Sequence, residues 1–222
     1  MKNLELKNLE LKNLYQKIDR CIFCKKNRNP LQHIHGYGSI RPRLMLILIN
    51  PTYRNVSSAP GYSGLRFPFI GVRHFWKVLA DGGLINKKIG YALPPRSAWH
   101  LKHTEATQKE LFKNKLFLTN IVKCCYNHPH YPEKKIIQEQ LQFLKKELQI
   151  VKPKYIIAFG GLVYKVLTGK NIVLSKYWRN SSRKKEALKE KISGLAIPVI
   201  PSYYPIARGN PKKAAAILRN IK

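Results

Sequence analysis

The chain has 222 residues and is 44% hydrophobic, which is enough to bury a domain-sized core and excludes a disordered chain. It carries 42 Lys and Arg against 11 Asp and Glu, and the formal net charge of +31 predicts a polyanionic partner, above all nucleic acid. The scarcity of carboxylates argues against two-metal nucleases and paired-acid sugar hydrolases, since both need clustered acidic side chains.

The N-terminal half opens with an imperfect five-residue repeat, KNLEL-KNLEL-KNLYQ, over residues 2–16. Five residues fit helical and solenoid periods poorly, so we expect a marginal helix or tether at 1–20 and a domain at 21–222. The apolar run RLMLILI at 43–49 is typical of a buried parallel strand and ends in Asn50-Pro51. A loop follows, then a helix beginning at 74–79, then mixed polar loops over 84–114.

The C-terminal half alternates strands with helices. The apolar runs LFLTNIV, YIIAF and IPVIP predict strands at 116–122, 155–159 and 197–201. Helices are predicted after Pro132-Glu133, after Gly160-Gly161 and over 211–221, and the basic segment 175–193 is expected to be exposed. The alternation predicts an α/β fold, a three-layer sandwich whose central, mostly parallel four-stranded sheet is flanked by helices.

Ligands of such sheets bind beyond the carboxyl ends of the strands, so residues that directly follow the strands are candidates for the site. These residues are Asn50-Pro51, Asn120, Gly160-Gly161 and Tyr203-Tyr204-Pro205. Asn120 stands out, because an amide within an apolar strand is costly to bury unless it is hydrogen-bonded.

Four segments along residues 21–219 carry a family resemblance. INPTYRN, followed by FPFIGVRHFWKVLADGGL, is similar to the first motif of the mismatch-specific uracil/thymine glycosylases, and Asn50 and Pro51 match it. LTNIVKC, VKPKYIIAFGG and SYYPIARGNP are similar to motifs of the iron–sulfur family of thermostable uracil glycosylases. The order of the segments resembles the uracil-DNA glycosylase superfamily, which implies its fold for residues 21–222.

The resemblance implies base excision, in which a damaged base is flipped out of DNA and its N-glycosidic bond is hydrolysed. Asn50 would orient the attacking water, with Pro51 beside it in the substrate site. Phe69 would stack on the flipped base, and Asn120 would pair with the O4 and N3–H edge of uracil, since an amide offers a donor and an acceptor. Each residue also has a structural alternative: Asn50-Pro51 as a turn, Phe69 as a core aromatic, and Asn120 as a contact to a neighbouring loop. The iron–sulfur family has a glutamate where this chain has Ile49.

The closing motif departs from the family pattern at one position. Where the family has His-Pro, this chain has Tyr204-Pro205, and a tyrosine hydroxyl donates from a different distance and with a higher pKa. Tyr204 is therefore either the second catalytic group or the reason for weak or lost activity. Ile206 and Arg208 would lie in a loop that invades the duplex, and Lys123 would be a further DNA contact.

Four cysteines, Cys21, Cys24, Cys124 and Cys125, are candidate metal ligands, because C-x-x-C in a cytosolic chain is more typical of a metal or redox site than of a structural disulfide. Three of them match cysteines of the iron–sulfur family, which implies a [4Fe–4S] cluster, and the fourth family position falls at about Gln140. The alternatives are no metal, or zinc on three cysteines and one histidine from His33, His35, His128 and His130.

Three hypotheses of function result. The first is a monofunctional glycosylase of base excision repair that removes uracil or a related deaminated base. The second is a non-catalytic or weakly active DNA-binding member of the same superfamily, favoured by Ile49 and Tyr204. The third, an unrelated nucleotide-binding protein, lacks its phosphate loop G-x-x-x-x-G-K-[ST]. We expect a cytoplasmic monomer with DNA and no membrane as partner, because no apolar run is long enough to span a bilayer.

Overall fold

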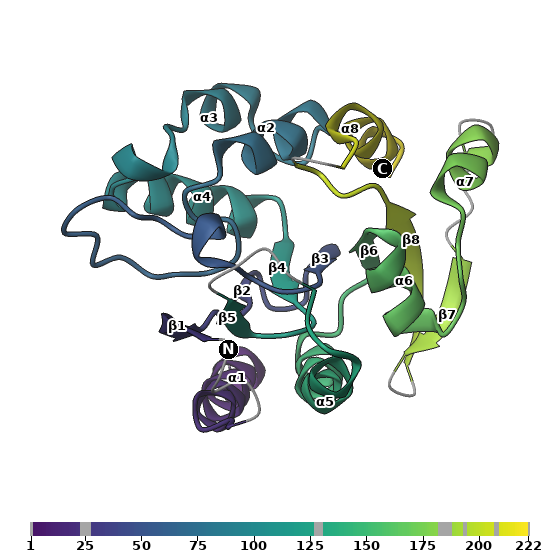
Figure 1. Ribbon diagram of the computed structural model, residues 1–222, viewed down its shortest axis with the longest axis horizontal. Helices are drawn as coiled ribbons and strands as arrows, with labels where there is room; N and C mark the ends of the chain where they lie inside the picture. The colour runs from purple at the N-terminus through teal and green to yellow at the C-terminus, as the bar shows by residue number, and fades with distance from the viewer. Residues whose placement is uncertain are drawn as a thin grey trace.

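A six-stranded mixed sheet in the order β2-β4-β3-β6-β8-β7 forms the centre of the computed structural model (Figure 1). The structure describes residues 2–22, 28–126, 131–181, 188–192, 195–206 and 209–221. The four central strands are parallel and are the four predicted ones: β4 (Leu116–Asn120), β3 (Leu44–Leu48), β6 (Tyr155–Phe159) and β8 (Leu195–Ser202). The predicted three-layer α/β fold is confirmed. Two antiparallel edge strands, β2 (Tyr37–Gly38) and β7 (Leu188–Ile192), extend the predicted sheet.

Helices cover both faces of this sheet (Figure 1). On one face lie α1 (Lys2–Asp19), α5 (Lys134–Val151) and α6 (Gly161–Thr168). On the other lie α2 (Arg73–Asp81), α3 (Lys87–Ala92), α4 (Leu101–Lys113) and α8 (Pro211–Arg219). The remaining elements are α7 (Leu174–Ser181), the 3-10 turns η1 (Tyr53–Asn55) and η2 (Arg96–Ala98), and an antiparallel pair of β1 (Arg28–His33) and β5 (Cys124–Tyr126). No helix among the described residues is long and apolar enough to cross a membrane.

The strand β3 shows how the sequence builds two cores. All five of its residues are buried, as its continuous apolar run predicts. Because side chains alternate along a strand, Met45 and Ile47 pack with α1 and α5, whereas Leu44, Leu46 and Leu48 pack with α2 and α8. The same alternation decides which polar side chains at the carboxyl ends of the strands share a face.

Helix α1 is packed into the first core rather than loosely tethered. Leu11, Leu14 and Ile18 are buried there, and α1 contacts α5. This buried face could not be predicted from the five-residue repeat, because the leucines of the repeat do not recur at a helical spacing. The N-terminal segment that the sequence separates from the domain therefore contributes to the domain core.

Helix α4 has no counterpart among the predicted elements, because polar residues form its buried face. Thr104, Thr107 and Glu110 are buried on it, and Leu111 is the one apolar residue that accompanies them. The Thr104 hydroxyl lies 2.7 Å from the Tyr62 hydroxyl and accepts a hydrogen bond from the Trp99 indole at 3.0 Å. A hydrophobic periodicity cannot reveal a helix whose core contacts are hydrogen-bonded polar groups.

Candidate functional site

The carboxyl ends of the parallel strands bring the two candidate asparagines to one edge of the sheet. Asn120 is the last residue of β4 and is the register partner of Leu48 in β3. Asn50 follows Leu48 by two residues, and the amide of Ile121 donates to the Leu48 carbonyl at 2.8 Å. The two asparagines therefore project from adjacent strand ends, where ligands of parallel sheets bind.

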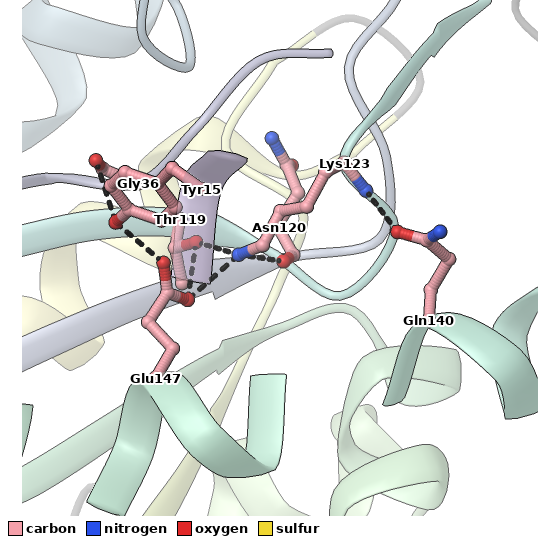
Figure 2. Close-up of polar contacts among 7 residues, drawn as sticks. All are labelled: Tyr15, Gly36, Thr119, Asn120, Lys123, Gln140 and Glu147. Carbon is pink, nitrogen blue, oxygen red and sulfur yellow. Dashed lines mark hydrogen bonds and ion pairs between the residues drawn. The ribbon is translucent and has the colours of Figure 1, made fainter. Parts of the chain in front are cut away.

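The amide of Asn120 is the most unusual group at this edge. Asn120 is 1% exposed, and within the described part of the chain neither its Nδ2 nor its Oδ1 has a hydrogen-bond partner. Its neighbour Thr119 donates to Glu147 of α5, so Asn120 points to the opposite face of the sheet, and Figure 2 shows its amide directed away from Glu147. Leaving a buried amide unsatisfied costs about 1–3 kcal/mol, so Asn120 lowers the stability of the folded protein.

Asn50 lies in a tight turn. It is 8% exposed, and its Nδ2 donates to the Pro51 carbonyl over a long 3.3 Å. That carbonyl also accepts from the Tyr126 amide at 3.1 Å, which joins the turn to β5. Ile49, where the iron–sulfur family carries its acid, is buried in the first core. The turn thus presents an amide and no carboxylate at the end of β3.

Phe69 lies in the second core, on the side of the sheet to which Asn120 points. Its ring stacks on Phe75 with 4.3 Å between centroids, and its carbonyl accepts from the Trp76 indole at 3.0 Å. Its φ of 66° is in the left-handed region, which is uncommon for a bulky residue and is found disproportionately at functional sites. The backbone is therefore held in a strained conformation to place this ring.

The end of β8 adds a residue that the sequence interpretation missed. Ser202 is fully buried, and its hydroxyl has no partner within the described chain. Ser202 is the register partner of Phe159, and its carbonyl accepts from the amide of Gly160, whose φ is 99°. Its place at the end of a predicted strand was the signal that could have identified it. The sheet edge therefore holds a second orphaned polar group besides Asn120.

Tyr204 and Ile206 follow Ser202 and pack partly buried against the second core. Arg208, the third predicted residue of this loop, lies outside the described residues. The amide of Asn210 donates to the Tyr204 carbonyl at 3.1 Å, and the Asn210 side chain caps α8. The loop is thus anchored at the start of α8, with Tyr204 on its sheet side.

Gly209 is required by this loop. A Cβ at Gly209 would lie 1.9 Å from the Tyr204 carbonyl oxygen, so we expect Gly209→Ala to displace Tyr204 and lower any activity at least about tenfold. Gly83→Ala is the control for a glycine replacement without a clash, because a Cβ at Gly83 would meet nothing within 4 Å; its φ of 70° means that this variant loses stability through backbone strain alone. Single-turnover rates and thermal unfolding of both variants check this, and equal activity in the two would contradict it.

Lys123 is not a DNA contact. Its side chain is fully buried, and its ammonium pairs with Glu147 at 2.7 Å beneath the sheet (Figure 2). The expectation of a phosphate contact is corrected by this burial, since a phosphate cannot reach the ammonium. Burial lowers the Lys123 pKa, while the Glu147 charge acts in the opposite direction.

The described cysteines do not assemble the predicted four-cysteine set. Cys124 and Cys125 are consecutive in β5, so they point to opposite faces, Cys124 into the first core and Cys125 into a separate cluster with Ile34 and Val56. Burial raises the Cys125 pKa to about 12, because the thiolate would lose its hydration there. Cys125 therefore projects away from Cys124, its neighbour among the predicted ligands.

The other predicted ligands are engaged elsewhere or lie outside the described residues. The Cys21 sulfur accepts from Gln140 Nε2 at 3.1 Å, so Gln140 does lie beside the cysteine where a fourth ligand would be. His33 and His35 approach Asp19, at 3.6 and 2.8 Å. Cys24, His128 and His130 are not among the described residues. Within the described ranges, no three His, Cys, Asp or Glu side chains group as metal ligands.

The fold is that of an α/β protein with two asparagine amides at the carboxyl edge of a parallel sheet. A protein-family comparison agrees, because the model of the uracil DNA glycosylase superfamily matches residues 35–221. The chain belongs to this superfamily. No curated protein matches the chain.

Proposed function

We propose that the protein is a monofunctional DNA glycosylase that removes uracil, or a related deaminated base, after the base is flipped out of the DNA. The single observation that carries this proposal is the orphaned Asn120 amide at the end of β4. A uracil edge offers an acceptor at O4 and a donor at N3–H, which would satisfy both amide atoms at once. Cytosine presents the opposite pattern at these atoms, so the same amide would select against it.

In the proposed reaction the bond between the sugar C1′ and the base nitrogen breaks, and its electron pair leaves with the base. Asn50 orients a water whose oxygen bonds to C1′ and whose proton is lost to solvent. An amide is a poor general base, so this step is slower than it would be with a carboxylate. Phe69 supplies a stacking surface, and the Tyr204 hydroxyl is the proposed donor to the departing base. No step of the proposal passes through a metal or cluster.

The second candidate is a DNA-binding member of the superfamily without activity. Two features favour it: Ile49 supplies no acid, and Tyr204 replaces the family histidine. Both candidates share the Asn120 base contact, and they differ only in whether the bond is broken.

A cluster of one tyrosine and two arginines next to the turn is the proposed contact with the DNA backbone. Tyr53 follows Asn50 by three residues, and the guanidinium carbons of Arg54 and Arg96 lie 5.7 and 5.3 Å from its ring centroid. Arg96 Nη1 also donates to the Tyr53 carbonyl at 2.7 Å, and the exposed Arg54 donates from its Nε to the Tyr53 hydroxyl at 3.1 Å. Charged groups beside the site suit phosphates that flank a flipped nucleotide.

Arg54→Ala is expected to weaken binding to all DNA sequences equally and to reduce the slope of log Kd against log salt by about 1. Lys146→Ala is the matched control, since Lys146 is exposed in the last part of α5, which leads to the amino end of β6. Fluorescence anisotropy over a salt series measures both. Equal slopes for the two variants would show that the tyrosine–arginine cluster is not at the DNA.

Base release tests the proposal as a whole. Purified protein is incubated with labelled duplexes that carry uracil opposite guanine, uracil opposite adenine, or hypoxanthine, and abasic sites are cleaved with alkali. The proposal predicts strand cleavage only after alkali, which a monofunctional enzyme requires. Binding without cleavage on any duplex would favour the second candidate, and would make Tyr204 the first residue to replace by histidine.

A further inference from the structure

The buried ammonium of Lys123 holds the backbone of Asn120. Its three hydrogens have three partners: the Asn120 carbonyl at 2.8 Å, Glu147 Oε2 at 2.7 Å, and the Thr119 hydroxyl (Figure 2). The amide of Lys123 donates to Gln140 Oε1 at 3.3 Å. The turn that follows Asn120 is therefore held by a fully buried ammonium group on the α5 side of the sheet.

Glu147 connects this ammonium to the N-terminal helix. Its Oε2 accepts from Thr119 and Lys123, and its Oε1 lies 2.8 Å from the hydroxyl of Tyr15 in α1. The Tyr15 hydrogen is shared with the Gly36 carbonyl at 3.0 Å. Burial raises the Tyr15 pKa well above its usual value, so the hydroxyl remains a donor. Tyr15 lies outside residues 35–221, which match the superfamily.

Stability alone does not explain this network. The Lys123 and Glu147 side chains are both fully buried, and replacing such an ion pair by apolar residues is often neutral or stabilising. Gly36 points to the same constraint, because a Cβ there would lie 2.5 Å from Glu147 Oε1. The network fixes the backbone of Asn120, and the side-chain amide of the same residue has no partner among the described residues. A misplacement of 1 Å in such a group can cost about a hundredfold in rate.

We propose that Tyr15, Glu147 and Lys123 are positioning residues that aim the Asn120 amide at the flipped base, so that helix α1 is part of the base-recognition apparatus. The inference deepens the proposed function and rests on it for the identity of the ligand. It places no new group in contact with the base. It assigns instead a role to a helix that the superfamily match does not cover.

The test compares Tyr15→Phe, which removes one hydroxyl, with Leu14→Ala, which removes buried apolar atoms of the same helix and has no part in the network. The first readout is the ratio of Kd for a duplex with 2′-fluoro-2′-deoxycytidine, whose base presents the opposite edge, to Kd for a duplex with non-hydrolysable 2′-fluoro-2′-deoxyuridine. Tyr15→Phe is expected to lower this ratio about fivefold, whereas Leu14→Ala lowers the unfolding temperature and leaves the ratio unchanged.

The double variant Lys123→Met with Glu147→Leu removes the pair without leaving an uncompensated charge. We expect it to remain folded, with the loss of partners for the Thr119 hydroxyl and the Asn120 carbonyl as its cost in stability, and to lower the same ratio at least about twentyfold. An unchanged ratio in this folded variant and in Tyr15→Phe would overturn the proposal.

Amide hydrogen exchange separates this inference from the proposed function. The amides of Ile121 and Val122 donate to β3 and its following residue at 2.8 and 2.9 Å, next to Asn120. The positioning role predicts exchange about tenfold faster at both amides in Tyr15→Phe and unchanged in Leu14→Ala. If wild type does not distinguish the two duplexes, the proposed function fails and exchange alone decides the positioning role. Unchanged exchange in Tyr15→Phe would then overturn it.

Discussion

Asn120→Leu is expected to stabilise the protein and at the same time to abolish base excision. Leucine has a similar volume and removes a buried amide without partners in the described chain, so the free energy of unfolding should rise by about 1–3 kcal/mol. Single-turnover excision of uracil should fall at least about a hundredfold, because the base edge loses both of its partners. Chemical denaturation and alkali-cleavage kinetics measure the two effects on the same preparation.

Gln140→Leu is the matched control for the stability effect. Gln140 is as buried as Asn120, but its amide is satisfied, since it donates to Cys21 and accepts from the Lys123 amide. Its replacement should destabilise the protein by about 1–2 kcal/mol, opposite in sign to Asn120→Leu. Loss of stability in both variants would mean that Asn120 has a structural partner and is not held for a ligand.

Asn50→Ala is expected to abolish excision while leaving recognition of the base intact. Its Nδ2 donates to the Pro51 carbonyl over a long 3.3 Å, in the turn at the end of β3. Without a group to orient the water, single-turnover excision should fall by about 100- to 1000-fold. The affinity for a duplex with 2′-fluoro-2′-deoxyuridine should stay within about twofold of wild type, since Asn120 and Phe69 remain.

Asn86→Ala provides the matched control on an asparagine with a structural role in a helix. Asn86 caps α3 by accepting from the Lys88 amide at 2.8 Å, so its loss should lower stability by about 1 kcal/mol. Excision should be unaffected. If Asn50→Ala retained full activity, water orientation by Asn50 would be excluded.

The fold was predictable because apolar periodicity marks the parallel strands. Each central strand appears within two residues of its predicted ends, and the helix after Pro132-Glu133 begins at Lys134. What periodicity could not show is structure held by polar groups. Helix α4 buries threonines and a glutamate, and the edge strand β2 is two residues long.

The candidate site was predictable to the extent that it follows strand ends. Asn50 and Asn120 were identified in this way, and the structure places them at adjacent strand ends. Phe69 was proposed from the family resemblance alone, and it lies in the second core. Lys123 was misassigned, because a lysine in a strongly basic chain is expected at the surface, and its burial depends on Glu147, 24 residues away. Pairing between distant side chains leaves no local pattern in the sequence.

The most direct test of the account observes the side-chain amide of Asn120 by NMR, in the free protein and with a duplex that carries 2′-fluoro-2′-deoxyuridine. The account predicts that the Asn120 NH₂ resonances shift and become protected from exchange with this duplex but not with a duplex that carries 2′-fluoro-2′-deoxycytidine, whose base presents the opposite edge. Identical Asn120 resonances with the two duplexes would contradict it, since the amide would then have no base to pair with.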